Sequence, residues 1–200
     1  MKSIQIAAAV TLVSVFAAGC KPSPAPEAAA PAEAAAAAPA AAPAEAAVLT
    51  VIKSVAIDAP ADAVWMKARD FNNLNGWHPA VAKTEIVEGS NNTVGAVRLL
   101  TLAGDAPATI KEKLTAFDEA GKTYRYEIVE GVLPVTAYSS TFAVTTDASG
   151  KAIATWSSTF KRADTSPTPA AGKDDAAATT TIEGVYTAGL DNLKKILEAK

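Results

Sequence analysis

The stretch IEGVYTAGLDNLKKIL, residues 182–197, decides the fold. Its apolar residues recur at the spacing of a helix that buries one face. Gly184 and Gly189 lie inside this helix, where a glycine costs about 1 kcal/mol relative to alanine. Close packing on a sheet, or room left for a ligand, accounts for such a cost. We therefore expect a long C-terminal helix that packs against a partner through Ile182, Val185, Tyr186, Gly189, Leu190, Leu193, Ile196 and Leu197.

Strand-like segments precede this helix. Residues 49–57 alternate apolar with more polar side chains, which predicts a first strand. Pro60 suits the start of a short helix, and the turn-rich segment 72–79 suits a second one. Six more strands follow, and most of them are separated by short turn sequences that favour antiparallel hairpins. These six are residues 83–88, 94–102, 109–117, 123–129, 136–145 and 152–160.

This order of elements predicts one α+β domain over residues 48–200. Its seven strands form a curved antiparallel sheet around the long C-terminal helix, and the two short helices follow the first strand. Strand parity places aromatic and aliphatic residues on the face that meets the helix. We therefore expect a mostly apolar wall that carries only a few polar groups.

Cys20 is the only cysteine, and it directly follows an apolar segment that begins near Ile4. A cationic start, a short apolar stretch and small residues before a break indicate a secretory signal peptide over residues 1–19. The ending Gly19-Cys20 resembles the bacterial lipoprotein lipobox, although Ala17 stands where that motif most often has leucine. The resemblance implies that Cys20 is lipidated and becomes the new N-terminus. The alternative is an ordinary cleaved signal with a cysteine there by chance.

Residues 21–47 contain only Ala, Pro, Glu, Lys and Ser. Prolines break any helix that the alanines favour, so we expect segment 20–47 to be a disordered tether that begins at the lipidated cysteine. In Gram-negative lipoproteins an aspartate after the cysteine tends to retain the protein in the inner membrane, and Lys21 stands there instead. We therefore expect a lipid-anchored periplasmic protein, held by the outer membrane rather than the inner one.

The composition limits the classes of partner. The formal net charge is −3 with no basic cluster, which argues against nucleic acid. One histidine and no cysteine in the exported part leave almost nothing for a zinc or iron site. No phosphate-binding or dinucleotide-binding motif and no serine-nucleophile motif occurs. We expect neither a metal nor a cofactor.

Six segments occur in a fixed order along the chain: DFNNLNGWHP (70–79), GAVR (95–98), KEKL (111–114), YEIVEG (126–131), LPV (133–135) and EGVYTAGL (183–190). As an ordered set they resemble the polyketide cyclase/dehydrase-like branch of the SRPBCC (START-like, helix-grip) superfamily. The similarity covers about residues 50–160 and 179–200. It implies the helix-grip fold, a hydrophobic cavity between sheet and helix, and binding of lipids, polyketides or other apolar molecules.

Arg98 and Glu112 are the charged residues that strand parity places on apolar faces. One interpretation is functional: Arg98 grips a ligand carboxylate or enolate, and Glu112 acts as a general base. The other is a cross-strand ion pair that neutralises itself inside the domain. We favour the ion pair.

His78 is the only histidine and lies between Trp77 and Pro79, in a loop that we expect to cover one end of the cavity. It is a candidate for proton transfer, but a histidine that caps backbone or meets solvent is the more common case. Aromatic residues on inward faces either contact a ligand or fill the interior. The expected ligand-binding set is Trp77, His78, Arg98, Glu112, Tyr126, Tyr138 and Trp156.

The first functional hypothesis is an exported, membrane-tethered carrier of a hydrophobic small molecule. The second is an accessory protein of a periplasmic oxidation complex, because some relatives in this branch are associated with periplasmic methanol oxidation. The third is a cyclase- or dehydratase-like enzyme that uses Glu112, Arg98 and His78. Topology alone does not distinguish them.

Overall fold

A computed structural model describes residues 46–106 and 108–199. The predictions for the signal peptide, for Cys20 and for most of the tether lie outside the described residues. The elements are β1 (Leu49–Ile57), α1 (Ala61–Ala68), the 3-10 helix η1 (Leu74–Gly76), β2 (Val81–Glu88), β3 (Val97–Leu102), β4 (Thr109–Asp118), β5 (Thr123–Gly131), β6 (Val135–Thr146), β7 (Ala152–Arg162) and α2 (Asp175–Glu198).

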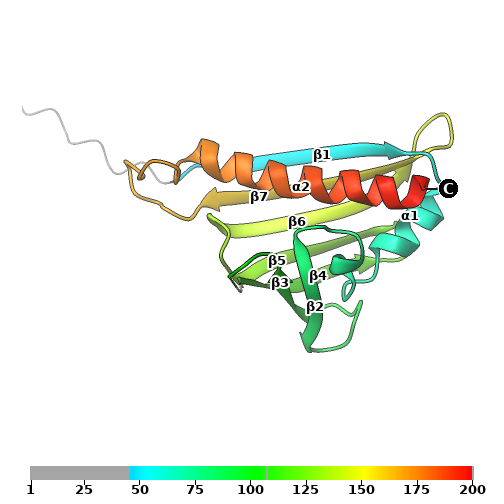
Figure 1. Cartoon of the computed structure of the whole chain (residues 1–200), viewed down its shortest axis with the longest axis horizontal. Helices are drawn as coiled ribbons and strands as arrows, with labels where there is room; N and C mark the ends of the chain where they lie inside the picture. The colour runs from blue at the N-terminus through cyan, green and yellow to red at the C-terminus, as the bar shows by residue number, and fades with distance from the viewer. Residues whose placement is uncertain (1–45, 107, 200) are drawn as a thin grey trace, which may run out of the picture. The chain divides into compact units, whose positions relative to one another are not determined.

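The seven strands form one antiparallel sheet in the order β1-β7-β6-β5-β4-β3-β2. Consecutive strands from β2 to β7 pair as neighbours. β1 pairs with β7 and forms the edge of the sheet opposite β2. Figure 1 shows α2 running along the sheet beside β1 and β7. The predicted α+β fold, a curved sheet with a long C-terminal helix, is confirmed.

Element boundaries differ from the predictions where the backbone turns. β3 begins at Val97 rather than at 94, because Gly95 before it has a left-handed φ of 95°. The predicted second short helix is the single 3-10 turn η1. In β6 a register shift lies between Thr136 and Ser139, and Ala137 within it has φ 49°. Such a bulge re-aims the side chains beside it.

Helix α2 begins at a capped end. The side chain of Asp174 accepts a hydrogen bond of 2.8 Å from the Ala177 amide, as expected for an N-cap. The nearly buried Arg162 at the end of β7 forms an ion pair with Asp175 at 2.6 Å. These contacts fix the start of α2 near the end of the sheet. The helix face toward the core consists of Ala178, Ile182, Tyr186, Gly189, Leu190 and Leu193.

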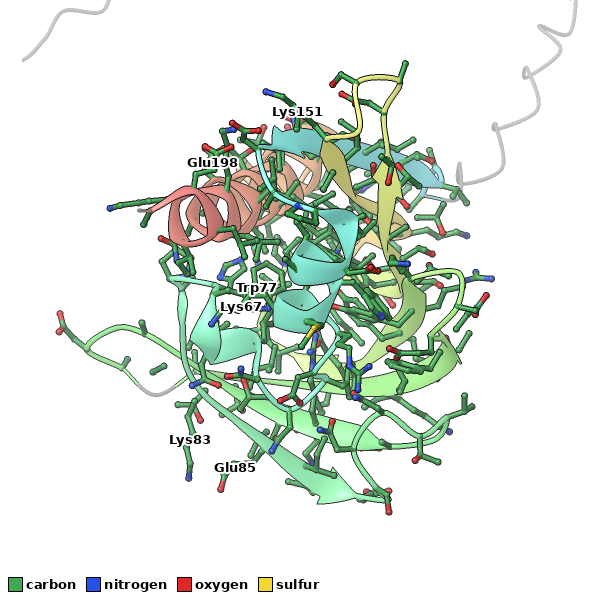
Figure 2. The ribbon with its side chains drawn as sticks, turned by 90° about the vertical axis from the view of Figure 1, so that its right-hand side faces the viewer. Lys67, Trp77, Lys83, Glu85, Lys151 and Glu198 are labelled. Atoms are coloured by element: carbon green, nitrogen blue, oxygen red, sulfur yellow. The ribbon has the colours of Figure 1, made fainter. Side chains whose placement is uncertain are left out.

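The edge strand β2 carries charge on its outer side. Lys83 and Glu85 form an ion pair at 2.7 Å, with the Lys83 side chain largely exposed and that of Glu85 partly exposed. Figure 2 shows them at the periphery, whereas Trp77 lies in the interior of the domain. Two register shifts interrupt the pairing of β2 with β3.

Candidate functional site

A cavity of about 90 Å³ lies between the sheet and helix α2. Its wall combines side chains from η1, from strands β2 to β7 and from α2. Glu112 is the acidic residue in this lining, and most of the others are apolar or aromatic. The deeper part of the wall consists of Leu74, His78, Val81, Leu100, Ile110, Glu112, Tyr126, Tyr138, Trp156 and Ile182.

The mouth of the cavity is apolar and partly exposed. It is formed by Ala80, Leu102, Ile128, Leu133 and Val185. Leu133 belongs to the apolar turn between β5 and β6, and Val185 lies on α2. Pockets for drug-sized ligands measure about 300–1,000 Å³. A ligand larger than a few heavy atoms therefore requires these mouth residues to move apart.

Arg98 and Glu112 lie opposite each other on β3 and β4. Arg98 Nε donates to Glu112 Oε2 at 2.6 Å, and Arg98 Nη1 donates to the Phe71 carbonyl at 3.0 Å. Arg98 Nη2 also lies 2.6 Å from Oε2, but the geometry of this ion-pair contact does not make a hydrogen bond. The guanidinium lies over the Phe71 ring at 4.0 Å from its centroid. The structure thus contains the cross-strand ion pair.

Both members of this pair are buried: 1% of Arg98 and 5% of Glu112 is exposed. Burial raises the pKa of Glu112, and the adjacent Arg98 charge opposes that rise. Arg98 keeps its proton in proteins, so it needs a counter-charge here. Glu112 Oε2, contacted by two guanidinium nitrogens, supplies it.

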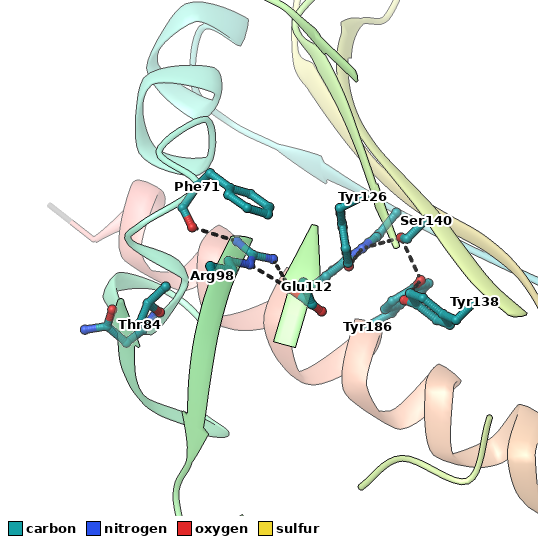
Figure 3. Close-up of polar contacts among 10 residues, drawn as sticks. Phe71, Thr84, Arg98, Glu112, Tyr126, Tyr138, Ser140 and Tyr186 are labelled. Carbon is teal, nitrogen blue, oxygen red and sulfur yellow. Dashed lines mark hydrogen bonds and ion pairs between the residues drawn. The ribbon is translucent and has the colours of Figure 1, made fainter. Parts of the chain in front are cut away.

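A chain of buried hydroxyl groups borders the cavity (Figure 3). Ser140 Oγ donates to the Ser157 carbonyl at 2.9 Å, so its hydrogen is already used. The Tyr186 hydroxyl, 3.0 Å away, must therefore donate to Ser140. Tyr138 in turn donates to Tyr186 across 2.5 Å. The direction of every hydrogen in this chain follows from the carbonyl at its end.

Trp156 connects this chain to Tyr126. Its Nε1–H lies 3.0 Å from Ser140 Oγ and 2.9 Å from the Tyr126 oxygen, so both oxygens accept from it. The Trp156 ring stacks on Tyr186, with centroids 4.5 Å apart and planes 12° from parallel. Burial raises the pKa of both Tyr126 and Tyr186, which keeps both phenols neutral.

His78 connects the loop after η1 to helix α2. Its Nε2 lies 3.0 Å from the Val185 carbonyl, which accepts only, so Nε2 carries the hydrogen. Its Nδ1 accepts from the Ala80 amide at 3.2 Å. Both nitrogens of the neutral ring are thus occupied by backbone groups. Burial lowers the pKa of His78, and the Arg98 charge lowers it further, while the Val185 hydrogen bond opposes the change.

This lowered pKa predicts a loss of stability on acidification. The unfolded chain takes up a proton on His78 near pH 6.5, and the folded chain does so only at lower pH. The free energy of unfolding should therefore fall as pH drops below about 6.5. Urea unfolding at pH 7.5 and 5.5 should show a smaller drop for His78→Gln than for the wild type. Equal drops in both proteins would remove His78 as the cause.

The structure brings five of the seven predicted ligand-binding residues to the cavity wall: His78, Glu112, Tyr126, Tyr138 and Trp156. Trp77 and Arg98 are buried but are not part of this lining. Tyr186 and Ser140, which complete the hydroxyl chain, were not among the predicted ligand-binding residues. Both are polar residues on faces predicted to be buried, and that signal was available.

A larger groove of about 740 Å³ lies on the surface beside α1. Four of its charged residues form ion pairs, Arg69 with Glu119 and Lys122 with Asp62 at 3.0 Å, and the fifth, Asp70, accepts a hydrogen bond from Asn91. Such exposed pairs are typical of a solvated surface. The smaller apolar cavity is therefore the candidate site.

Within residues 46–106 and 108–199, no helix is long and apolar enough to cross a bilayer. No group of three or more His, Cys, Asp or Glu residues in that part of the chain is placed to hold a metal ion.

Comparisons with known proteins agree with this geometry. Residues 49–198 match the model of a family described as polyketide cyclase/dehydrase and lipid transport. The structure of protein XoxI from Bacillus cereus is 28% identical over 74% of this chain and 94% of its own, with a TM-score of 0.63. An uncharacterized protein from Bacillus thuringiensis is 28% identical over 76% of this chain and 100% of its own, with a TM-score of 0.64. A search of curated proteins found no match.

Proposed function

The chain belongs to the polyketide cyclase/dehydrase and lipid transport family, and on this premise we propose that it binds and carries an apolar small molecule between its sheet and helix α2. One observation carries the proposal. A cavity exists at this place, with an apolar wall, an apolar mouth and few polar groups, which is the usual character of a small-molecule site. The family description supports lipid-like ligands without naming one.

The hydrogen bonds of His78 and Glu112 favour a carrier over a cyclase or dehydratase. Both ring nitrogens of His78 are occupied by backbone groups, so it has no free position to take a proton from a substrate. One oxygen of Glu112 is held by Arg98. Catalysis by either residue would first require these contacts to break.

We further propose that the domain is exported and held at a membrane through Cys20. The support is the signal-like segment 1–19, the lipobox-like ending Gly19-Cys20, and the Ala/Pro composition of residues 21–47. A tethered carrier searches a volume close to the membrane surface, where apolar ligands partition. Lys21 after the cysteine favours the outer membrane.

Expression of the full chain and of Cys20→Ser in a Gram-negative host tests both parts. The wild type should partition into the detergent phase and Cys20→Ser into the aqueous phase. Native mass spectrometry of Cys20→Ser should show a bound small molecule, and a larger side chain at the mouth, Leu102→Trp, should remove it. Val94→Trp, at an exposed residue outside the cavity lining, is the matched control and should keep the ligand.

Two results would overturn these proposals separately. Aqueous partitioning of the wild type would exclude the lipid anchor. The binding function would be excluded by the absence of any bound mass, together with unshifted cavity methyl signals in NMR during titration with cyclopentanol and cyclopentanone.

A further inference from the structure

We infer that the cavity selects a neutral ligand that carries a hydroxyl group, and that Glu112 Oε1 accepts the hydrogen bond from this hydroxyl. The inference rests on the proposed binding function, because it specifies the ligand of the same cavity. It is carried by a carboxylate oxygen of the cavity wall that Arg98 does not contact, and by a local charge that sums to zero.

The acceptor is Glu112 Oε1. The contacts of Arg98 with the Glu112 carboxylate both go to Oε2. Oε1 has no hydrogen-bond partner in the described part of the chain, although only 5% of Glu112 is exposed. Figure 3 shows the carboxylate between Arg98 on one side and the tyrosines on the other. Oε1 is not among the fully buried atoms that lack a partner, so we infer that it is open to the cavity that Glu112 lines, where a donor on the ligand can reach it.

The Tyr126 hydroxyl group already has partners. Its oxygen accepts the Trp156 Nε1–H at 2.9 Å. It also forms a side-chain hydrogen bond with Tyr138, whose own hydrogen goes to Tyr186, so Tyr126 donates to Tyr138. The open position in this wall is therefore Glu112 Oε1. An alcohol can donate to Oε1, whereas a ketone can only accept.

The local charge excludes ionised ligands. The charges of Arg98 and Glu112 cancel, and the tyrosines beside them are neutral. A carboxylate or an ammonium group would bring an unpaired charge into an apolar cavity, which is costly. Arg98, the group that would attract an acid, is directed toward Glu112 and Phe71 and does not line the cavity. A neutral hydroxyl can donate to Oε1 without adding charge.

Three probes that share a five-membered ring test this selectivity: cyclopentanol, cyclopentanone and protonated cyclopentylamine. NMR titration of the full chain with Cys20→Ser follows the methyl signals of Leu100 and Ile110 in the cavity wall. Cyclopentanol should bind at least tenfold more tightly than cyclopentanone, because only the alcohol can donate a hydrogen bond to the charged acceptor Glu112 Oε1. The amine should bind more weakly than the alcohol. Equal affinities for alcohol and ketone would overturn the inference but leave the binding function standing.

A double substitution tests whether Glu112 causes the preference for the alcohol. Arg98→Met with Glu112→Leu removes both charges together, so that neither remains unpaired. This double variant should still bind cyclopentanol and cyclopentanone, and its preference for the alcohol over the ketone should fall below about twofold. A tenfold preference that survives would show that Glu112 is not the acceptor. Glu130→Gln removes an exposed carboxylate of β5 outside the lining and should leave the preference unchanged.

Discussion

Glu112→Leu alone is expected to destabilise the protein by about 3–5 kcal/mol, because it leaves the Arg98 guanidinium buried without a counter-charge. The Phe71 carbonyl and the Phe71 and Tyr126 rings would be its remaining partners. Dipoles and ring faces compensate a buried charge less well than a carboxylate does. Urea unfolding followed by circular dichroism measures the loss directly.

The double substitution Arg98→Met/Glu112→Leu should recover most of that stability. Replacing a buried ion pair by well-packed apolar residues is often neutral or stabilising by about 1–4 kcal/mol. Lys111–Glu130, an exposed pair at 2.8 Å between β4 and β5, is the comparison, and Glu130→Leu should cause no comparable loss. If the double variant were as unstable as the single one, the unpaired charge would not be the source of the loss.

Gly189→Ala is expected to destabilise the protein by roughly 2 kcal/mol or more, despite the better helix propensity of alanine. A methyl group at this position would lie 2.6 Å from His78 Cδ2 and 2.9 Å from Trp156 Cζ3. Both rings are buried and held by hydrogen bonds, so neither can move aside cheaply. The melting temperature should fall accordingly, and the His78 ring signals should shift in NMR.

Gly184→Ala is the matched control in the same helix. A methyl group there would meet no other atom within 4 Å. The substitution should therefore stabilise the protein by about 1 kcal/mol, the difference in helix propensity. Close packing explains Gly189, whereas nothing in the structure explains Gly184. A similar change in stability at both positions would contradict the steric account.

Strand parity predicted which side chains meet in the interior. Arg98 and Glu112 were both assigned to inward faces, and the hairpin register of β3 and β4 places them directly opposite each other. The inward assignment of Tyr126, Tyr138 and Trp156 is also confirmed by their burial. Alternation with a period of two and short hairpins carry this information locally, so sequence alone is sufficient.

The connections within the hydroxyl chain and the size of the cavity could not be predicted from the sequence. Tyr186 lies on α2, 48 residues after Tyr138 and 46 residues after Ser140, and it forms hydrogen bonds with both. The rotation of α2 that aims Tyr186 depends on its approach to His78 at Gly189. The bulge at Ala137 also sets the direction of Tyr138 in β6. The cavity of about 90 Å³ is the space that remains after the side chains have packed, and a pattern of residue types does not predict its volume.

The charged outer edge of the sheet has a consequence for crowded conditions. A free edge strand can recruit the edge of another molecule and start an aggregate. Along β2 the salt-bridged Lys83 and Glu85 and the two interruptions of register make such recruitment unfavourable. Crowded copies of the domain should therefore not join through their β2 edges.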